Sequence, residues 1–174
     1  MHIQIAIDLI RNAGLNGSNS SVWADLGCGT GLFTYALANI LPYGSTIYAV
    51  DKTDVKLISH ANPHKVDCIK VQADFLRDPI PLPLLDGVIM ANSFHYVADK
   101  ESFISKLKNL ISPGGKIIII EYDTDLPNSW VPYPMSFEAL QHFFHGQGFS
   151  SVKKLHDIPS VYGRARIYAA EISR

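Results

Sequence analysis

Short apolar runs alternate with longer, partly polar segments along most of the chain, which is the pattern of strands and helices in turn. The pattern predicts helices over residues 3–13, 30–41 and 99–111. A polar helix or turn is expected to start near Thr53. Five short runs predict strands over residues 21–26, 45–51, 66–74, 86–92 and 116–122. The chain therefore reads as an α/β protein.

The fourth and fifth of these strands, 86–92 and 116–122, are almost continuously apolar rather than alternating. Strands that are buried on both faces have this composition, which indicates a parallel sheet with helices on both sides. Prolines 79, 81 and 83 exclude a regular helix before the fourth strand. The sequence SPGG at 112–115 predicts a turn into the fifth strand.

The pattern changes after Tyr122. A polar and aromatic connection leads to a predicted helix over 136–147, and two strands follow near 149–156 and 165–172, with GRAR as part of the joining segment. Because no helix separates these two strands, they form a hairpin, and one of them must be antiparallel to the rest. We therefore predict a single domain over residues 1–174: a doubly wound, mostly parallel seven-stranded sheet with helices on both faces and an antiparallel C-terminal hairpin strand.

Composition narrows the functional classes. The 174 residues carry a net charge of −1, which gives no electrostatic footprint for nucleic acid or for an anionic membrane. No apolar run is long enough to span a bilayer, and the N-terminal sequence lacks the features of a signal peptide. Two cysteines are too few for a disulfide framework or a zinc cluster. These features favour a reduced, cytoplasmic protein.

The loop after the first strand, ADLGCGTG, carries the most informative spacing. Gly27, Gly29 and Gly31 follow a G-x-G-x-G pattern, and Leu32 stands where the dinucleotide fingerprint G-x-G-x-x-G requires its third glycine. Asp25 precedes the loop, and its carboxylate would repel a pyrophosphate but would suit a cationic ligand. The spacing therefore disfavours a nicotinamide-dependent oxidoreductase, which stays a rival hypothesis.

Five motifs in order resemble those of class I S-adenosylmethionine-dependent methyltransferases. They are ADLGCGTG, YAVD, QADF, DGVIMANSFHYV and SPGGKIIIIEY, and they cover nearly the whole chain. The resemblance implies that Asp51 binds the ribose hydroxyls of S-adenosylmethionine, that Asp74 binds the adenine amino group and that Phe75 flanks the base. The other cofactor-binding residues implied by the motifs are Asp25, Leu26, Gly27, Cys28, Gly29, Gly31, Lys52 and Asn92.

The expected acceptor site lies at the ends of the fourth and fifth strands. His95 is the best candidate for a catalytic base or substrate contact, with Tyr96 second, although His95 could equally cap or pack its loop. The string ANSFHY does not resemble the Asn/Asp-Pro-Pro-Tyr motif of DNA and glutamine N-methyltransferases, and it carries no carboxylate for a catalytic metal. His142 and His145 have no evident third metal ligand.

The predicted activity is in-line transfer of a methyl group from S-adenosylmethionine to a small-molecule acceptor without a metal. The connection after the fifth strand and the N-terminal helix are both short, so the pocket is expected to be open. An open pocket would suit a larger acceptor or completion by a second subunit in a homodimer. The alternative is a non-catalytic protein that binds S-adenosylmethionine as a regulatory or partner subunit, because the acceptor motif is undefined.

Overall fold

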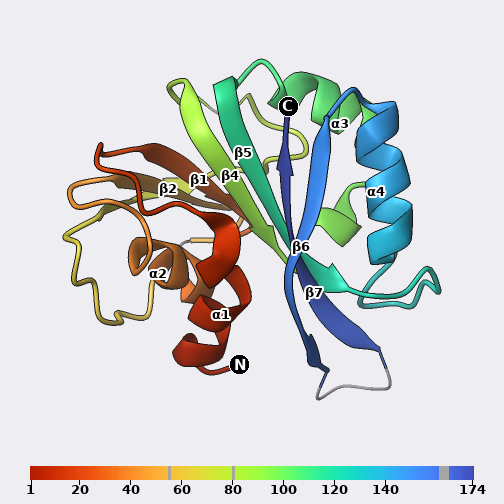
Figure 1. Ribbon diagram of the computed structural model, residues 1–174, viewed down its shortest axis with the longest axis horizontal. Helices are drawn as coiled ribbons and strands as arrows, with labels where there is room; N and C mark the ends of the chain where they lie inside the picture. The colour runs from red at the N-terminus through yellow and green to blue at the C-terminus, as the bar shows by residue number, and fades with distance from the viewer. Residues whose placement is uncertain (55, 80, 161–164) are drawn as a thin grey trace.

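A seven-stranded mixed sheet forms the centre of the protein in the computed structural model, which describes residues 1–54, 56–79, 81–160 and 165–174 (Figure 1). The strand order is β3-β2-β1-β4-β5-β7-β6. The strands are β1 (Val22–Leu26), β2 (Thr46–Asp51), β3 (Asp67–Gln72), β4 (Leu85–Ala91), β5 (Ile111–Tyr122), β6 (Ser151–Pro159) and β7 (Arg166–Ser173).

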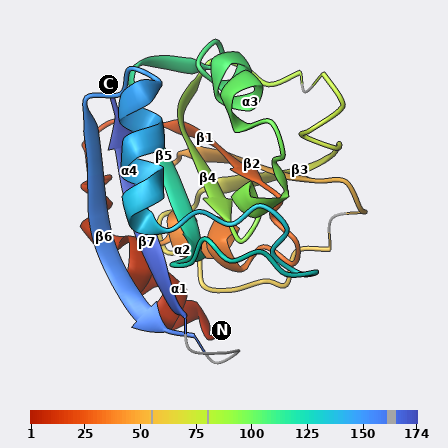
Figure 2. The same cartoon turned by 90° about the vertical axis from the view of Figure 1, so that its right-hand side faces the viewer.

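Helices cover both faces of this sheet, as Figure 2 shows with α3 and α4 on the near side and α1 and α2 behind. The helices are α1 (Ile3–Ile10), η1 (Arg11–Ala13), α2 (Leu32–Ala38), η2 (Phe94–Tyr96), α3 (Lys100–Leu107) and α4 (Phe137–Gly146). One buried cluster joins α1 and α2 to the sheet, and another joins α3 and α4 to its other face. The predicted doubly wound fold is therefore confirmed.

Strand β5 shows why a continuous apolar run belongs at the centre. Ile117 and Ile119 pack into the cluster below α3 and α4, whereas Ile118 and Ile120 pack into the cluster below α1 and α2. Successive side chains of a strand point to opposite faces, so a strand covered on both sides has no polar face. All four isoleucines are essentially inaccessible to solvent.

Several of the predicted elements differ in extent. The helix predicted over 99–111 covers only Lys100–Leu107, and Ile111 belongs to β5. The helix predicted over 30–41 begins at Leu32, because Gly31 stands at its N-cap with a left-handed backbone at φ +85°. It ends at Ala38, with Asn39 as its C-cap. Near Thr53 the structure has bends rather than a helix in the described residues between β2 and β3, so the turn is the correct alternative there.

The SPGG segment at 112–115 is not a turn ahead of the strand but an irregular part of β5. Leu85 pairs with Ile111 and Gly87 pairs with Lys116, so the four residues between Ile111 and Lys116 loop out from the ladder. Gly114 has φ +82° within this bulge, a conformation that glycine adopts without cost.

The C-terminal hairpin has the predicted polarity. Strand β7 is antiparallel to both β5 and β6, and it lies between them. Of the joining segment GRAR, residues 163 and 164 lie outside the described residues, and Arg166 begins β7. Within the described part of the chain, no helix has the length and apolar character needed to cross a membrane.

Candidate functional site

The glycine loop between β1 and α2 is fixed to the neighbouring strand by its own backbone. The amides of Gly27 and Cys28 both donate to the carbonyl of Val50, at 2.8 and 3.0 Å. Gly27 has φ +84°, and a methyl group there would lie 2.6 Å from Cβ of Ser93. Any side chain at Gly27 would therefore need both an unfavourable backbone conformation and a displaced neighbour.

Asp25, the last charged residue before the loop, is a buried carboxyl group with one satisfied oxygen. Thr34 Oγ1 donates to its Oδ2 at 2.6 Å, whereas Oδ1 has no hydrogen-bond partner among the described residues. Burial raises the pKa of Asp25 from 3.8 to about 7, and the Thr34 hydrogen bond opposes that rise only in part. A cation placed at Oδ1 would favour the ionised carboxylate and would supply the missing partner.

Asn92, which follows β4, repeats this arrangement on the neighbouring strand. Its side-chain oxygen Oδ1 also has no partner among the described residues, and its backbone is left-handed at φ +52°. A non-glycine residue in that region is uncommon and is often found at binding sites. Asp25 and Asn92 therefore provide two buried oxygen atoms that could each accept a hydrogen bond from a ligand.

Both residues line a cavity of about 420 Å³ above the glycine loop. The lining is completed by Met1, Ile5, Gly27, Cys28, Gly29, Thr30, Leu32, Phe33, Ala91, Tyr122, Ile158, Pro159 and Ile167. The cavity thus brings the loop together with α1, the ends of β4 and β5, and the β6–β7 hairpin. Parallel sheets of this type bind ligands at the carboxyl ends of their strands.

The other predicted acids extend the site along the same edge of the sheet. Asp74, Asp51 and Asp25 stand at the ends of the adjacent strands β3, β2 and β1. Asp51 accepts from the amide of Gly29 at 2.9 Å and from the amide and hydroxyl of Thr53 at 3.0 and 2.8 Å. Burial raises the pKa of Asp51, but these hydrogen bonds outweigh burial and hold it below its usual value.

The remaining predicted cofactor residues lie around this edge rather than inside the cavity. Asp74 accepts from the amide of Leu76 at 3.0 Å and so stabilises its own turn. Phe75 stacks edge-on against Phe103, with 5.9 Å between ring centroids. The carbonyl of the exposed Lys52 accepts from Gln72 Nε2 at 3.5 Å, and its side-chain charge helps to lower the pKa of Asp51. The carbonyl of buried Leu26 accepts from Ser93 Oγ at 2.6 Å.

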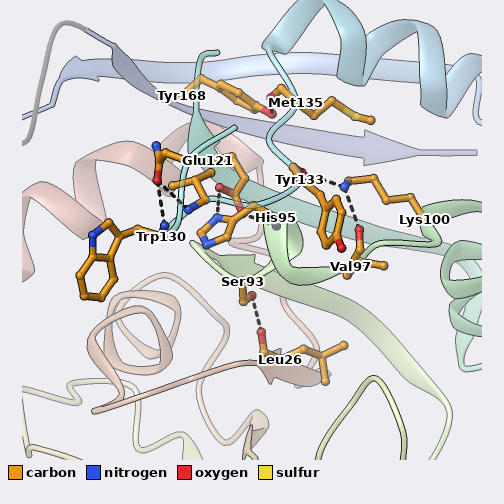
Figure 3. A network of polar contacts seen from close by, with 12 residues as sticks. Leu26, Ser93, His95, Val97, Lys100, Glu121, Trp130, Tyr133, Met135 and Tyr168 are labelled. Carbon is orange, nitrogen blue, oxygen red and sulfur yellow. Dashed lines mark hydrogen bonds and ion pairs between the residues drawn. The ribbon is translucent and has the colours of Figure 1, made fainter. Parts of the chain in front are cut away.

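His95 forms a buried pair with Glu121 near the end of β5 (Figure 3). Nδ1 of the ring lies 2.7 Å from Oε2, and the backbone amide of His95 donates to Oε1 at 3.1 Å. A carboxylate only accepts, so this contact places the proton of a neutral ring on Nδ1. Nε2 points away from Glu121 and has no partner among the described residues.

The connection between β5 and α4 passes over this pair. The amide of Tyr133 donates to the carbonyl of His95 at 3.1 Å, and Lys100 Nζ donates to the carbonyls of Val97 and Tyr133 at 2.9 and 2.8 Å. The Tyr96 ring packs against that of His95, with 4.3 Å between the ring centroids. It also lines a second cavity of about 640 Å³ beside α3, together with Leu26 and Phe75. Neither His95 nor Tyr96 lines the cavity above the glycine loop, and their catalytic roles stay predictions.

Replacing Glu121 with alanine should lower the free energy of unfolding by about 3 kcal/mol, because two donors of His95 would lose their acceptors in a buried site. Glu171→Ala, which breaks the partly exposed pair with Lys116 at 2.9 Å, is the matched control and should cost less than about 1 kcal/mol. Urea denaturation followed by circular dichroism measures both. Equal losses of unfolding free energy in the two variants would show that the buried His95–Glu121 pair stabilises the protein no more than a partly exposed pair does.

The sequence did not point to several residues that the structure brings to the site. They are Thr34, Ile158, Pro159 and Ile167. A threonine within an apolar helix face was a signal for Thr34, whereas the others depend on contacts between distant segments. No group of three or more potential metal ligands occurs in the described ranges, where His142 and His145 contact backbone carbonyls.

Comparison with known proteins adds family information to this geometry. A family model described as "Methyltransferase domain" matches residues 24–119. An uncharacterised methyltransferase of Mycobacterium tuberculosis is 29% identical over 102 residues, which is 58% of this chain and 50% of the relative. The chain therefore spans about half the length of the curated relatives that it matches first.

Solved structures share the fold over nearly the whole chain. A DhpI complex with S-adenosylhomocysteine is 22% identical, with a TM-score of 0.67 over 97% of this chain and 83% of the other. The 1,6-didemethyltoxoflavin-N1-methyltransferase of Burkholderia thailandensis, with 1,6-didemethyltoxoflavin and S-adenosylhomocysteine bound, is 16% identical. Its TM-score is 0.67 over 99% of this chain and 78% of the other. At these identities the likeness concerns the fold.

Proposed function

Because the chain belongs to the methyltransferase domain family, we propose that it transfers a methyl group from S-adenosylmethionine to a small-molecule acceptor. This membership confirms the predicted resemblance of the five sequence motifs to those of S-adenosylmethionine-dependent methyltransferases. The observation that carries the proposal is the unpartnered oxygen of Asp25 in a cavity walled by the glycine loop. A cationic amino-acid ligand fits that oxygen better than a phosphate does.

The residues present fit S-adenosylmethionine from one end to the other. Asp25 and Asn92 would accept from its ammonium group, and the glycine loop would let its backbone approach closely. Asp51 would accept from the ribose hydroxyls, as an acid at this position does in dinucleotide-binding folds. Asp74 and Phe75 stand at the next strand end, where the base would lie.

When bound, S-adenosylmethionine supplies an electrophilic methyl group on a positively charged sulfur. The bond from the acceptor nucleophile to the methyl carbon forms as the carbon–sulfur bond breaks, and the bonding electron pair stays on sulfur. The chain's contribution is to align the two reactants and to exclude water, through Asp25 and Asn92 at one end and the apolar cavity walls at the other.

A small-molecule acceptor is supported by the size of the cavity and by the relative of the same fold that binds 1,6-didemethyltoxoflavin. His95 is proposed as a base for this acceptor only if the connection after β5 moves, because Nε2 is covered in this structure. The pH profile of methyl transfer by His95→Gln tests that role, which an unaltered profile would exclude.

Asp51→Ala should weaken binding of S-adenosylhomocysteine by about 1.5–3 kcal/mol, the range for a hydrogen bond to a charged group. Asp67→Ala, at an exposed position on the edge strand β3, is the control and should leave the affinity unchanged. Isothermal titration calorimetry measures both. An Asp51→Ala affinity equal to that of the unsubstituted protein would remove Asp51 from the ribose site.

Formation of S-adenosylhomocysteine over a panel of acceptors tests the function itself. Turnover on at least one small molecule is the expected result. Tight cofactor binding without turnover on any acceptor would favour the alternative, a non-catalytic subunit. Binding of NAD without a response to S-adenosylmethionine would overturn the proposal altogether.

A further inference from the structure

The cavity above the glycine loop has a second half that the cofactor residues do not account for. Tyr122, Ile167 and Ile158 stand side by side on three neighbouring strands, since Tyr122 pairs with Ile167 on β7 and Ile167 pairs with Ile158 on β6. All three line the cavity and pack against the same buried cluster. They form an apolar row across the sheet, opposite the loop.

Helix α1 closes this half from the side. Ile5 lines the cavity although 42% of its surface is accessible to solvent. Ile5 therefore presents part of its apolar surface to the cavity. Together with Pro159, Ile5 extends the apolar row into a pocket wall.

Charged residues that stand next to the wall residues in the sequence form ion pairs. Arg166, which precedes Ile167, forms an ion pair with Asp157, which precedes Ile158. Asp123, which follows Tyr122, lies 3.6 Å from Lys154 Nζ. Of the described residues that line the cavity, Asp25 alone has a charged side chain. Among the described residues, the apolar half therefore offers no charged side chain to a ligand.

We propose that this apolar wall is the acceptor site, and that the acceptor is an uncharged, mainly apolar molecule. The inference rests on the proposed function, which places the methyl donor along the glycine loop. Burying a carboxylate or phosphate against this wall would cost several kcal/mol without a partner, so charged acceptors are selected against. For a hydroxyl acceptor, the new carbon–oxygen bond replaces the carbon–sulfur bond and the hydroxyl proton leaves to solvent.

A matched pair of probes tests this assignment. 2-Naphthol carries one hydroxyl group on an apolar ring system, and 6-hydroxy-2-naphthoic acid adds a carboxylate to the same framework. Naphthol fluorescence in the presence of saturating S-adenosylhomocysteine reports binding without any need for turnover. We expect 2-naphthol to bind at least tenfold more tightly than the acid.

Two variants locate the probe. Ile5→Glu and Ile158→Glu should each weaken 2-naphthol binding at least tenfold and leave the calorimetric affinity for S-adenosylhomocysteine within twofold. Ile69→Glu is the control, because Ile69 on the edge strand β3 is equally exposed, at 42%, and does not line the cavity. Ile5 lies on a helix surface, so its variant avoids the folding risk of a change in the sheet.

The outcomes separate the inference from the function on which it rests. Equal binding of the two probes, or 2-naphthol binding that neither variant alters, would overturn the acceptor site while cofactor binding stands. Failure of the unsubstituted protein to bind S-adenosylhomocysteine would overturn the proposed function instead.

Discussion

Replacing Asp25 with asparagine is expected to weaken binding of S-adenosylhomocysteine by roughly 10- to 150-fold and at the same time to stabilise the ligand-free protein. The loss of affinity corresponds to about 1.5–3 kcal/mol for a hydrogen bond to a charged group. The gain in stability comes from the removal of a buried carboxylate. A carboxyl group with one unpartnered oxygen is buried at a cost, which the neutral amide does not bear when the protein is at neutral or higher pH.

The sign of the pH dependence follows from the direction of the pKa shift. The pKa of Asp25 is raised from 3.8 to about 7 in the folded protein, so the folded state holds a proton that the unfolded state has lost between these values. The contribution of Asp25 to stability therefore falls as pH rises from about 4 to 7, by roughly 4 kcal/mol in all. Affinity for a cationic ligand should rise through the same window, because the carboxylate forms there.

Calorimetric titrations and urea denaturation at pH 5.5 and pH 8 measure both effects. Asp67→Asn, the same chemical change at an exposed position, is the control and should alter neither quantity. An Asp25→Asn protein that binds S-adenosylhomocysteine as tightly as the unsubstituted protein at pH 8 would show that Asp25 does not contact the ligand. A fall in its stability at pH 8 would contradict the cost assigned to the buried carboxyl group.

Alanine at Gly27 should lower the free energy of unfolding by about 2–4 kcal/mol. The left-handed backbone at φ +84° costs about 1 kcal/mol or more for alanine, and the contact of 2.6 Å with Ser93 Cβ adds an overpacking cost of about 1–3 kcal/mol. Ser93 cannot simply rotate away, because the clash involves its Cβ and its hydroxyl already donates to Leu26.

Gly29→Ala separates backbone strain from contact with the ligand. Gly29 has φ +52°, and a methyl group there would meet no atom within 4 Å. Its alanine variant should therefore lose only about 1 kcal/mol of stability. It should still bind S-adenosylhomocysteine much less tightly, because Gly29 belongs to the glycine loop along which the methyl donor is proposed to lie. Thermal unfolding of the two variants, with and without S-adenosylhomocysteine, measures this difference, and equal destabilisation by both would refute the proposed role of Ser93.

The fold could be predicted from the sequence because its strongest signals are local. The apolar runs of β4 and β5 and the glycine spacing after β1 need no knowledge of distant contacts. Element ends were less predictable. The start of α2 depends on the backbone conformation of Gly31, and the length of β5 depends on a bulge opposite β4, which only the partner strand reveals.

The residues of the candidate site also differ in how far they could be predicted from the sequence. Asp25, Asp51 and the loop glycines could be proposed from the sequence because they lie at or just after the ends of recognisable strands, and their contacts with a cofactor stay predictions. Glu121 is 26 positions from His95, and Ile158 belongs to the last hairpin, so their places in the site depend on tertiary contacts. His95 itself shows the limit most clearly, since its position in the motif was evident but its burial beneath the connection was not.

The placement of β7 between β5 and β6 has a consequence for how the chain acquires its structure during synthesis. The outer edge of β5, which ends at Tyr122, has no partner until β7, which starts at Arg166, leaves the ribosome. At about 5–20 residues per second, that edge stays open for roughly 2–9 seconds. An unpaired apolar edge is a template for intermolecular pairing. Slow translation between these strands should therefore increase aggregation of nascent chains rather than assist their folding.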